Sequence, residues 1–126
     1  MPKKILDAPS GPNPVGPYSV VTEANGFVFV SGQGALDPAT NTLVTGGVEA
    51  ETDQTMKNIG AILGDVGLGY EDIVKTTIFL ADMGDFPKVN EIYGRYVGDS
   101  RPARSTVQVA ALPLGIQVEI EVIAAR

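Results

Sequence analysis

The sequence predicts an α+β fold in which two helices pack on one face of a mainly antiparallel or mixed sheet. Residues 48–66 place apolar side chains on one face of a helix, and so does the stretch between Asp85 and Gly98. Several shorter stretches alternate apolar and polar residues, as half-buried strands do. Because these strands do not alternate regularly with the helices, their order along the chain favours α+β. A chain of 126 residues can bury a core of its own, so we take residues 1–126 as one domain.

The N-terminal part of the chain is expected to contain mainly strands and loops. Between two of the predicted strands stands Asn25-Gly26, the strongest short signal for a β-hairpin. A loop rich in proline and glycine precedes the first strand of this hairpin, and a second loop follows its last strand. The predicted strands are residues 3–6, 20–24 and 27–30, with a further short strand at residues 42–44 inside the loop of residues 35–47.

Local signals define both helices. The first should end before Gly67, which stands in the position that commonly takes a left-handed conformation. Asp85 can cap the second, with Pro87 in the first turn, where a missing N–H costs nothing, and Gly98 at its end. The β-branched and aliphatic residues 74–80 predict a strand between the two helices.

Two alternating runs near the C-terminus, residues 104–111 and 117–124, are expected to pair as a hairpin that turns near Leu114. This hairpin carries the cation Arg104 and the carboxylates Glu119 and Glu121 in otherwise apolar sequence. In that register Arg104 lies ~16 Å along the strand from the partner of Glu119. An ion pair within the chain is therefore disfavoured. A neighbouring subunit and a small anionic ligand remain as the two candidate partners of Arg104.

Composition excludes several kinds of function. The net charge is −6 and the nine basic residues form no cluster larger than Lys3-Lys4, so nucleic acid is not an expected partner. The chain has neither Cys nor His, which excludes disulfides, thiolate chemistry, the usual zinc ligands and imidazole-based triads. No apolar segment resembles a signal peptide or a membrane span, so we expect a soluble cytoplasmic protein.

Residues 31–34, Ser-Gly-Gln-Gly, follow a predicted strand and superficially suggest a phosphate-binding loop. A dinucleotide fingerprint requires a third glycine where this chain has Asp37, and no helix begins there. We therefore expect a strand end that exposes backbone amides and the Ser31 hydroxyl. Tyr18 stands in a Gly-Pro loop, where its phenol either lines a cleft or packs. Asn90 is expected to be solvated, and the core is expected to include the three aromatic residues Phe27, Phe29 and Phe86.

Nearly the whole chain resembles the RidA (YjgF) family of enamine/imine deaminases. The run of residues 101–113, beginning Arg-Pro-Ala-Arg-Ser-Thr, carries the most specific similarity. Other matching segments are residues 16–18, 30–33, 72–77, 89–93 and 119–124. The resemblance implies a chorismate-mutase-like fold assembled as a homotrimer with clefts between subunits. It also implies hydrolysis of 2-aminoacrylate-type enamines, through their 2-imino acid tautomers, to 2-oxo acids and ammonia without a cofactor or a metal.

The resemblance also implies roles for individual residues. It makes Arg104 the ligand of the substrate carboxylate and Glu119 the residue that positions water. The supporting site residues that it implies are Tyr18, Ser31, Gly32 and Asn90. Thr106 stands where many members have cysteine, and its hydroxyl can still donate a hydrogen bond to a substrate. Gly34 replaces a bulky aliphatic residue of many members, which bears on cleft shape and substrate preference.

Two other functions are compatible with such a chain. The same cleft could bind a 2-oxo acid or another small carboxylate without turnover, as a sensor or a protein-interaction trimer. Relatives have also been described as ribonucleases or translation inhibitors. The acidic charge and the absence of His make this the least expected function here.

Overall fold

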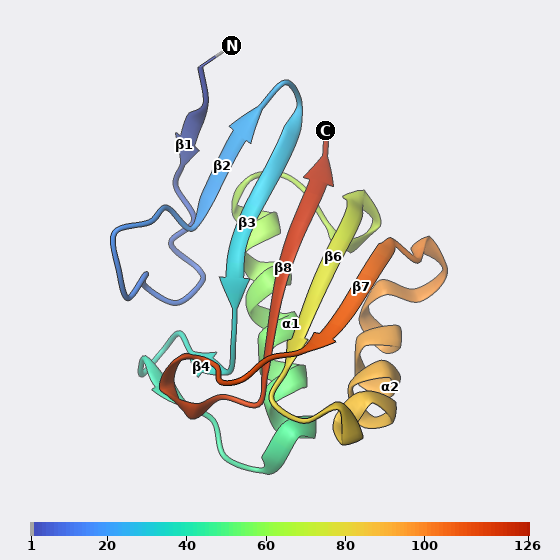
Figure 1. Cartoon of the computed structure of the whole chain (residues 1–126). Coiled ribbons are helices and arrows are strands. Elements are labelled where there is room, and N and C mark those ends of the chain that lie inside the picture. The colour runs from blue at the N-terminus through green and yellow to red at the C-terminus, as the bar shows by residue number, and fades with distance from the viewer. Residues whose placement is uncertain (1) are drawn as a thin grey trace.

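A six-stranded sheet forms one layer of the protein (Figure 1), seen in a computed structural model that describes residues 2–126. Its spatial order is β1-β2-β3-β8-β6-β7, with only the β6–β7 pair parallel. The six strands are β1 (Lys4–Leu6), β2 (Val21–Ala24), β3 (Phe27–Gln33), β6 (Ile73–Leu80), β7 (Ala103–Gln108) and β8 (Val118–Ala125). A separate small hairpin consists of β4 (Leu36–Asp37) and β5 (Thr42–Leu43). The expected mixed sheet is thus confirmed.

The hairpin predicted at Asn25-Gly26 is present. β2 and β3 pair antiparallel, and both turn residues have positive φ, 53° at Asn25 and 80° at Gly26. These are the angles of the tight turn that matches strand twist. β3 continues three residues beyond the predicted end, through Ser31 to Gln33, and includes an irregularity in its pairing with β8.

The predicted C-terminal hairpin is wrong. Both strands exist, but β6 lies between them: β7 pairs parallel with β6, and β8 pairs antiparallel with β6 on its other side. The segment between β7 and β8, which includes the 3₁₀ turn η4 (Pro113–Gly115), therefore crosses the end of β6. Alternation of apolar residues identifies a strand and its faces, but it does not identify the neighbouring strand.

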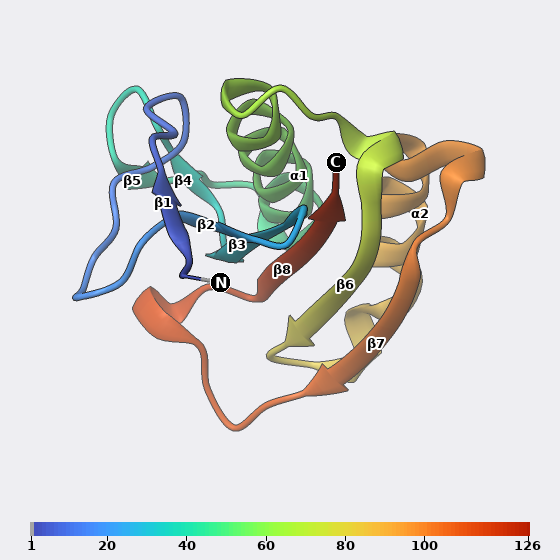
Figure 2. The same cartoon turned by 90° about the horizontal axis from the view of Figure 1, so that it is seen from above.

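Two helices form the second layer. Figure 2 shows α1 (Gly47–Asp65) over β3 and β8, and α2 (Phe86–Val97) beside β6 and β7. Gly67 ends α1 as predicted, with φ of 81° and a hydrogen bond from Leu68 N to Leu63 O. Asp85 occupies the predicted N-cap position of α2, but its side chain makes no capping bond. Asp82 instead accepts from Gly84 N in the preceding turn. The remaining 3₁₀ turns are η1 (Tyr70–Asp72), η2 (Met83–Asp85) and η3 (Gly98–Ser100).

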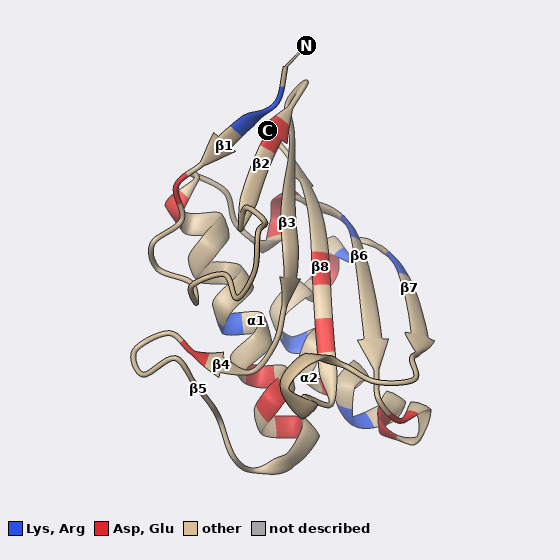
Figure 3. Cartoon of the chain, turned by 60° about the vertical axis from the view of Figure 1, so that its left-hand side comes forward, with Lys and Arg blue, Asp and Glu red and all other residues tan. Residues whose placement is uncertain are grey.

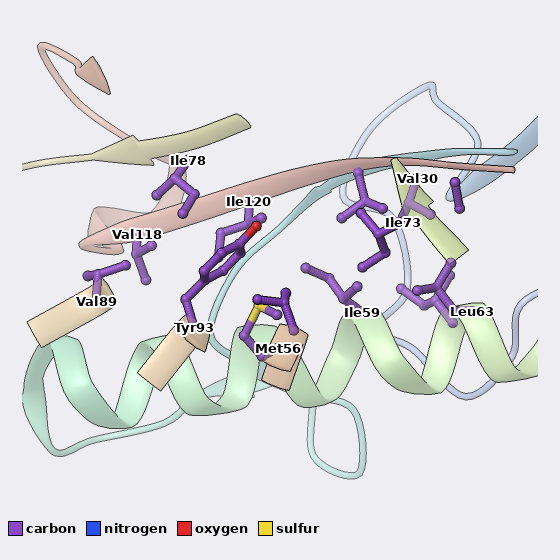
Figure 4. Close-up of a cluster of buried hydrophobic side chains, with 14 of the residues drawn as sticks. Val30, Met56, Ile59, Leu63, Ile73, Ile78, Val89, Tyr93, Val118 and Ile120 are labelled. Atoms are coloured by element: carbon purple, nitrogen blue, oxygen red, sulfur yellow. The ribbon is translucent and has the colours of Figure 1, made fainter. Parts of the chain in front are cut away.

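The core lies between the sheet and the helices (Figure 4). Alternate residues of the central strands, such as Val118 and Ile120, point to the helices and are fully buried, and they meet Met56 and Ile59 of α1. These contacts supply the apolar burial that holds the layers together. No helix within residues 2–126 is long and apolar enough to span a membrane.

The opposite face of the sheet is open in this chain. Phe27 and Phe29, predicted to be core residues, lie on this face and are 46% and 41% exposed. Only Phe86 of the three predicted aromatic residues packs against the core. The two phenylalanines alternate with buried Val28, so the strand prediction was right and the assumption that both faces are covered was wrong.

Candidate functional site

Arg104 lies on the helix-facing side of the edge strand β7, in register with buried Thr76. Its guanidinium carbon is 5.4 Å from the ring centre of Phe86 and 5.1 Å from that of Tyr93, both on α2. Such cation–π contacts fix the guanidinium without using its N–H donors. Within residues 2–126 these donors have no ion pair and no hydrogen bond. Arg104 is therefore oriented and able to bind an anion.

Two further candidate residues lie near Arg104. Asn90 of α2 is half-buried, contrary to the expectation that it is solvated, and lines the same open pocket as Arg104. Thr106 follows Arg104 by two residues on the same face of β7, and its Oγ1 is buried without a hydrogen-bond partner in the described chain. A buried hydroxyl without a partner is costly, so a ligand or a water molecule is expected to bind there.

Glu119 lies on the open face of the sheet, on β8. A Cβ atom built on Gly32 of β3 would lie only 2.5 Å from Oε2 of Glu119, so the carboxylate rests directly against the Gly32 backbone. Burial, followed by repulsion from Glu121, raises the pKa of Glu119 above its ordinary value of 4.5. Figure 3 shows these two acidic positions along β8. A carboxylate with a raised pKa is a better proton acceptor.

Glu119 lines a mainly apolar pocket with a volume of about 80 Å³. The pocket also contains Gly32 and the half-exposed Tyr18, so the structure brings these three predicted site residues together. The phenol oxygen of Tyr18 accepts a hydrogen bond from Val15 N at 3.1 Å, which leaves its proton available. Tyr18 therefore lines a cleft, one of the two alternatives considered for it. The apolar lining comes from the N-terminal loop, from β4 and from the turn before β8: Pro12, Pro14, Val15, Val20, Leu36, Pro113, Leu114 and Ile116.

Ser31 has a structural contact that the sequence did not predict. Its Oγ donates to Ser19 O at 2.6 Å, and its backbone N donates to Val20 O at 2.9 Å. Ser31 thereby joins the end of β3 to the loop that carries Tyr18. Its side chain shares a second open pocket with Tyr18 and Glu121.

The structure separates the candidate residues into two groups. Arg104, Asn90 and Thr106 lie by α2 at one edge of the sheet, and Tyr18, Ser31, Gly32 and Glu119 lie on or beside the open face. Arg104 and Glu119 are on opposite faces, two strands and three register positions apart, or roughly 10 Å in each direction between backbones. The sequence disfavours an ion pair between them because of the register of a predicted β7–β8 hairpin. That hairpin does not exist, and the two side chains are instead separated by β6 and by the sheet itself.

Sequence reasoning missed the residues that orient these groups. The helical spacing places Phe86 and Tyr93 on the apolar face of α2, and nothing in that spacing distinguishes a core residue from one that also supports a cation. Ile116, which lines the pocket, was not predicted because it lies between the two alternating runs of residues 104–111 and 117–124. No group of three or more carboxylates within residues 2–126 is placed to hold a metal ion.

The fold and the two groups of residues define an α+β protein with an arginine whose donors are free and a separate half-buried glutamate. Residues 8–126 match the family model described as endoribonuclease L-PSP. The chain is 47% identical to the mouse 2-iminobutanoate/2-iminopropanoate deaminase over 98% of its own length and 92% of that protein. The chain therefore belongs to the endoribonuclease L-PSP family, which includes RidA proteins.

Solved structures agree with this assignment. The Rid-family protein YyfA from Yersinia pestis superposes with a TM-score of 0.95 at 43% identity, covering 99% of this chain and 100% of that one. TdcF from E. coli, solved with bound serine, gives a TM-score of 0.91 at 36% identity over 98% of both chains.

Proposed function

We propose that this chain is a homotrimeric deaminase that hydrolyses 2-imino acids, formed from 2-aminoacrylate-type enamines, to 2-oxo acids and ammonia. One observation carries the proposal: a member of this family contains both an arginine with free donors, Arg104, and a half-buried glutamate of raised pKa, Glu119. The name of the mouse relative supports the substrate class.

The residues can perform each step of the hydrolysis. The two parallel N–H groups of Arg104 bind the substrate carboxylate, and Thr106 Oγ1 donates to the same carboxylate. Glu119 accepts a proton from a water molecule as the water oxygen bonds to the imine carbon. It gives that proton to the nitrogen, which forms a carbinolamine. Glu119 then takes the proton of the new hydroxyl group and passes it to the nitrogen as the C–N bond breaks, so that ammonia and a 2-oxo acid leave. The reaction consumes water and involves no redox change, so the proposal includes no cofactor.

The placement of Arg104 and Glu119 supports a site shared between subunits. Because they lie on opposite faces of one chain's sheet, a site that uses both must combine two subunits. We propose a cyclic trimer in which each cleft takes Glu119 and Tyr18 from one subunit and Arg104 and Asn90 from the next. The exposed phenylalanines on the open face support association there, since contiguous apolar surface favours burial.

Release of ammonia from freshly generated 2-iminopropanoate and 2-iminobutanoate tests the activity. Wild type should accelerate release, and Arg104→Lys should lose most of the activity while the trimer persists, because lysine lacks the planar fork. Glu119→Gln should lower kcat far more than it weakens binding of a 2-oxo acid. No acceleration by wild type would refute the activity.

Mixed subunits test the shared site. Inactive Arg104→Ala and Glu119→Ala subunits, mixed and allowed to exchange, should regain part of the activity, since some clefts then contain both residues. No recovery despite proven exchange, or full activity in a monomer, would refute the two-subunit arrangement.

A binding module for small carboxylates is the second candidate, supported by the serine bound in the TdcF structure. It predicts that wild type binds pyruvate or 2-oxobutanoate yet releases no ammonia above the uncatalysed rate. Ribonuclease activity is disfavoured by the net charge of −6 and the lack of His, and degradation of RNA by the purified trimer would overturn that judgement.

A further inference from the structure

Helix α1 carries three polar side chains at intervals of seven residues: Glu51, Asn58 and Asp65. Seven residues make about two helical turns, so the three side chains lie along one stripe of the helix. Each of them bonds to a different segment outside the helix. The stripe is therefore a series of anchors.

The three anchored segments lead to the walls of one pocket. Asp65 accepts from Ser10 N and Oγ, both at 2.7 Å, just before the loop of residues 12–15. Asn58 donates to Gly34 O at 3.1 Å and to Leu36 O at 2.8 Å. Glu51 accepts from Gln117, just before β8. All three segments line the apolar pocket that contains Glu119.

Glu51 is the buried carboxylate among these anchors. Its side chain is only 8% exposed, and within residues 2–126 no cation pairs with it. Its carboxylate accepts from Gln117 backbone N at 2.8 Å and from Gln117 Nε2 at 3.0 Å. A buried carboxylate without such donors is strongly disfavoured, so this pair holds Gln117 in one position.

Gln117 in turn lies in the bend just before β8, two residues ahead of Glu119. Its carbonyl oxygen accepts from Ala81 N at 3.0 Å, so the backbone on both sides of this residue is fixed. Two residues of extended chain span roughly 7 Å, and only Val118 separates Gln117 from Glu119. Displacement of Gln117 is therefore transmitted through Val118 to the carboxylate of Glu119.

We propose that Glu51 is a positioning residue for Glu119, acting through its two hydrogen bonds to Gln117. The inference rests on the proposed function for its kinetic consequence, but the positioning itself does not require activity. Glu51 positions Glu119 through its hydrogen bonds to Gln117 and not through its negative charge.

Two substitutions of Glu51 separate these roles. Glu51→Met fills similar space but accepts neither bond, so kcat for 2-iminobutanoate should fall about 10- to 100-fold as Glu119 shifts. KM and the Kd for 2-oxobutanoate should change less than about threefold, because Arg104 binds the carboxylate. Glu51→Gln should stay within about threefold of wild-type kcat, since its oxygen accepts from Gln117 N and the Gln117 amide can turn to accept from its nitrogen. Glu49→Met makes the same change on an exposed position of the same helix and should leave kcat unchanged.

Gln117→Leu is the substitute test if Glu51→Met does not fold. It removes the hydrogen bond from Gln117 Nε2 to Glu51 and keeps the one from the backbone N. It should lower kcat by a smaller factor than Glu51→Met, again with little change in KM. Wild-type kcat in folded Glu51→Met, or in Gln117→Leu when the former does not fold, would overturn the inference. Equal losses in Glu51→Gln and Glu51→Met would also overturn it, because charge would then be responsible.

A second readout works without turnover. The carboxyl ¹³C resonance of Glu119, assigned through Glu119→Gln, should titrate with a midpoint that differs from wild type by at least about half a pH unit in Glu51→Met, or in Gln117→Leu if Glu51→Met does not fold. The midpoint should be unchanged in Glu51→Gln and in Glu49→Met. Wild type that releases no ammonia refutes the proposed function alone. An unchanged Glu119 titration in Glu51→Met, or in Gln117→Leu as its substitute, refutes the positioning role.

Discussion

Replacing Gly32 by alanine should impair turnover without unfolding the protein. The new Cβ would lie 2.5 Å from Glu119 Oε2, 2.8 Å from Cδ and 3.1 Å from Cγ, whereas ordinary contact begins at 3.4 Å. The Glu119 carboxylate must therefore retreat by roughly 1 Å, a displacement that can cost about 100-fold in rate. The free energy of unfolding should change little, because the atom in the way belongs to a flexible side chain and Gly32 has no positive φ.

The assay is ammonia release from 2-iminobutanoate, with kcat and KM determined separately. kcat of Gly32→Ala should fall about 100-fold while KM stays within about threefold, because the carboxylate of the substrate binds elsewhere. Gly64→Ala is the matched control, since a Cβ there meets nothing within 4 Å. A Gly32→Ala variant with wild-type kcat would show that the position of Glu119 does not limit the reaction.

Two further predictions concern stability and specificity. Tyr96 donates to Asp53, which lowers the pKa of Asp53 below its ordinary 3.8, so the contribution of this bond is present above that pH and disappears as the pH falls through the lowered pKa. Tyr96→Phe should therefore lower the free energy of unfolding by about 1 kcal/mol at pH 7 and by nothing in strong acid, measured by urea denaturation. Ile116 Cδ1 lies 2.6 Å from the site of the missing Gly34 Cβ, so Ile116→Ala should enlarge the pocket. It should raise kcat/KM for longer aliphatic imino acids about tenfold relative to 2-iminopropanoate, and an unchanged ratio would exclude Ile116 as a determinant of specificity.

Local features of the fold were predictable from sequence because local physics determines them. The turn at Asn25-Gly26 and the end of α1 at Gly67 both depend on φ angles that few residues adopt. The order of strands was not predictable in this way, because insertion of β6 between β7 and β8 depends on contacts far apart in the chain. The exposure of Phe29 has the same origin, since a periodic pattern does not reveal whether anything covers the second face.

The candidate site shows the same limit. Arg104 and Glu119 were identifiable as charges in apolar strands, but their faces followed only from the true register. The buried carboxylate of Glu51 gave no signal at all, because a glutamate in a helix is ordinarily solvated. Its importance comes from a contact with Gln117, 66 positions later in the sequence.

The strand order also has a chemical consequence for the proposed reaction. Had β7 and β8 formed a hairpin that joined Arg104 to Glu119, the ion pair would have occupied the guanidinium donors and lowered the pKa of Glu119. Both effects oppose imine hydrolysis, which needs a free fork for the substrate carboxylate and a glutamate able to accept a proton. With β6 between the two strands and the side chains on opposite faces, each group remains available, and burial raises the pKa of Glu119. In the proposed trimer, a site between subunits would bring the two together only across a cleft, where the substrate carboxylate could bind to Arg104 first.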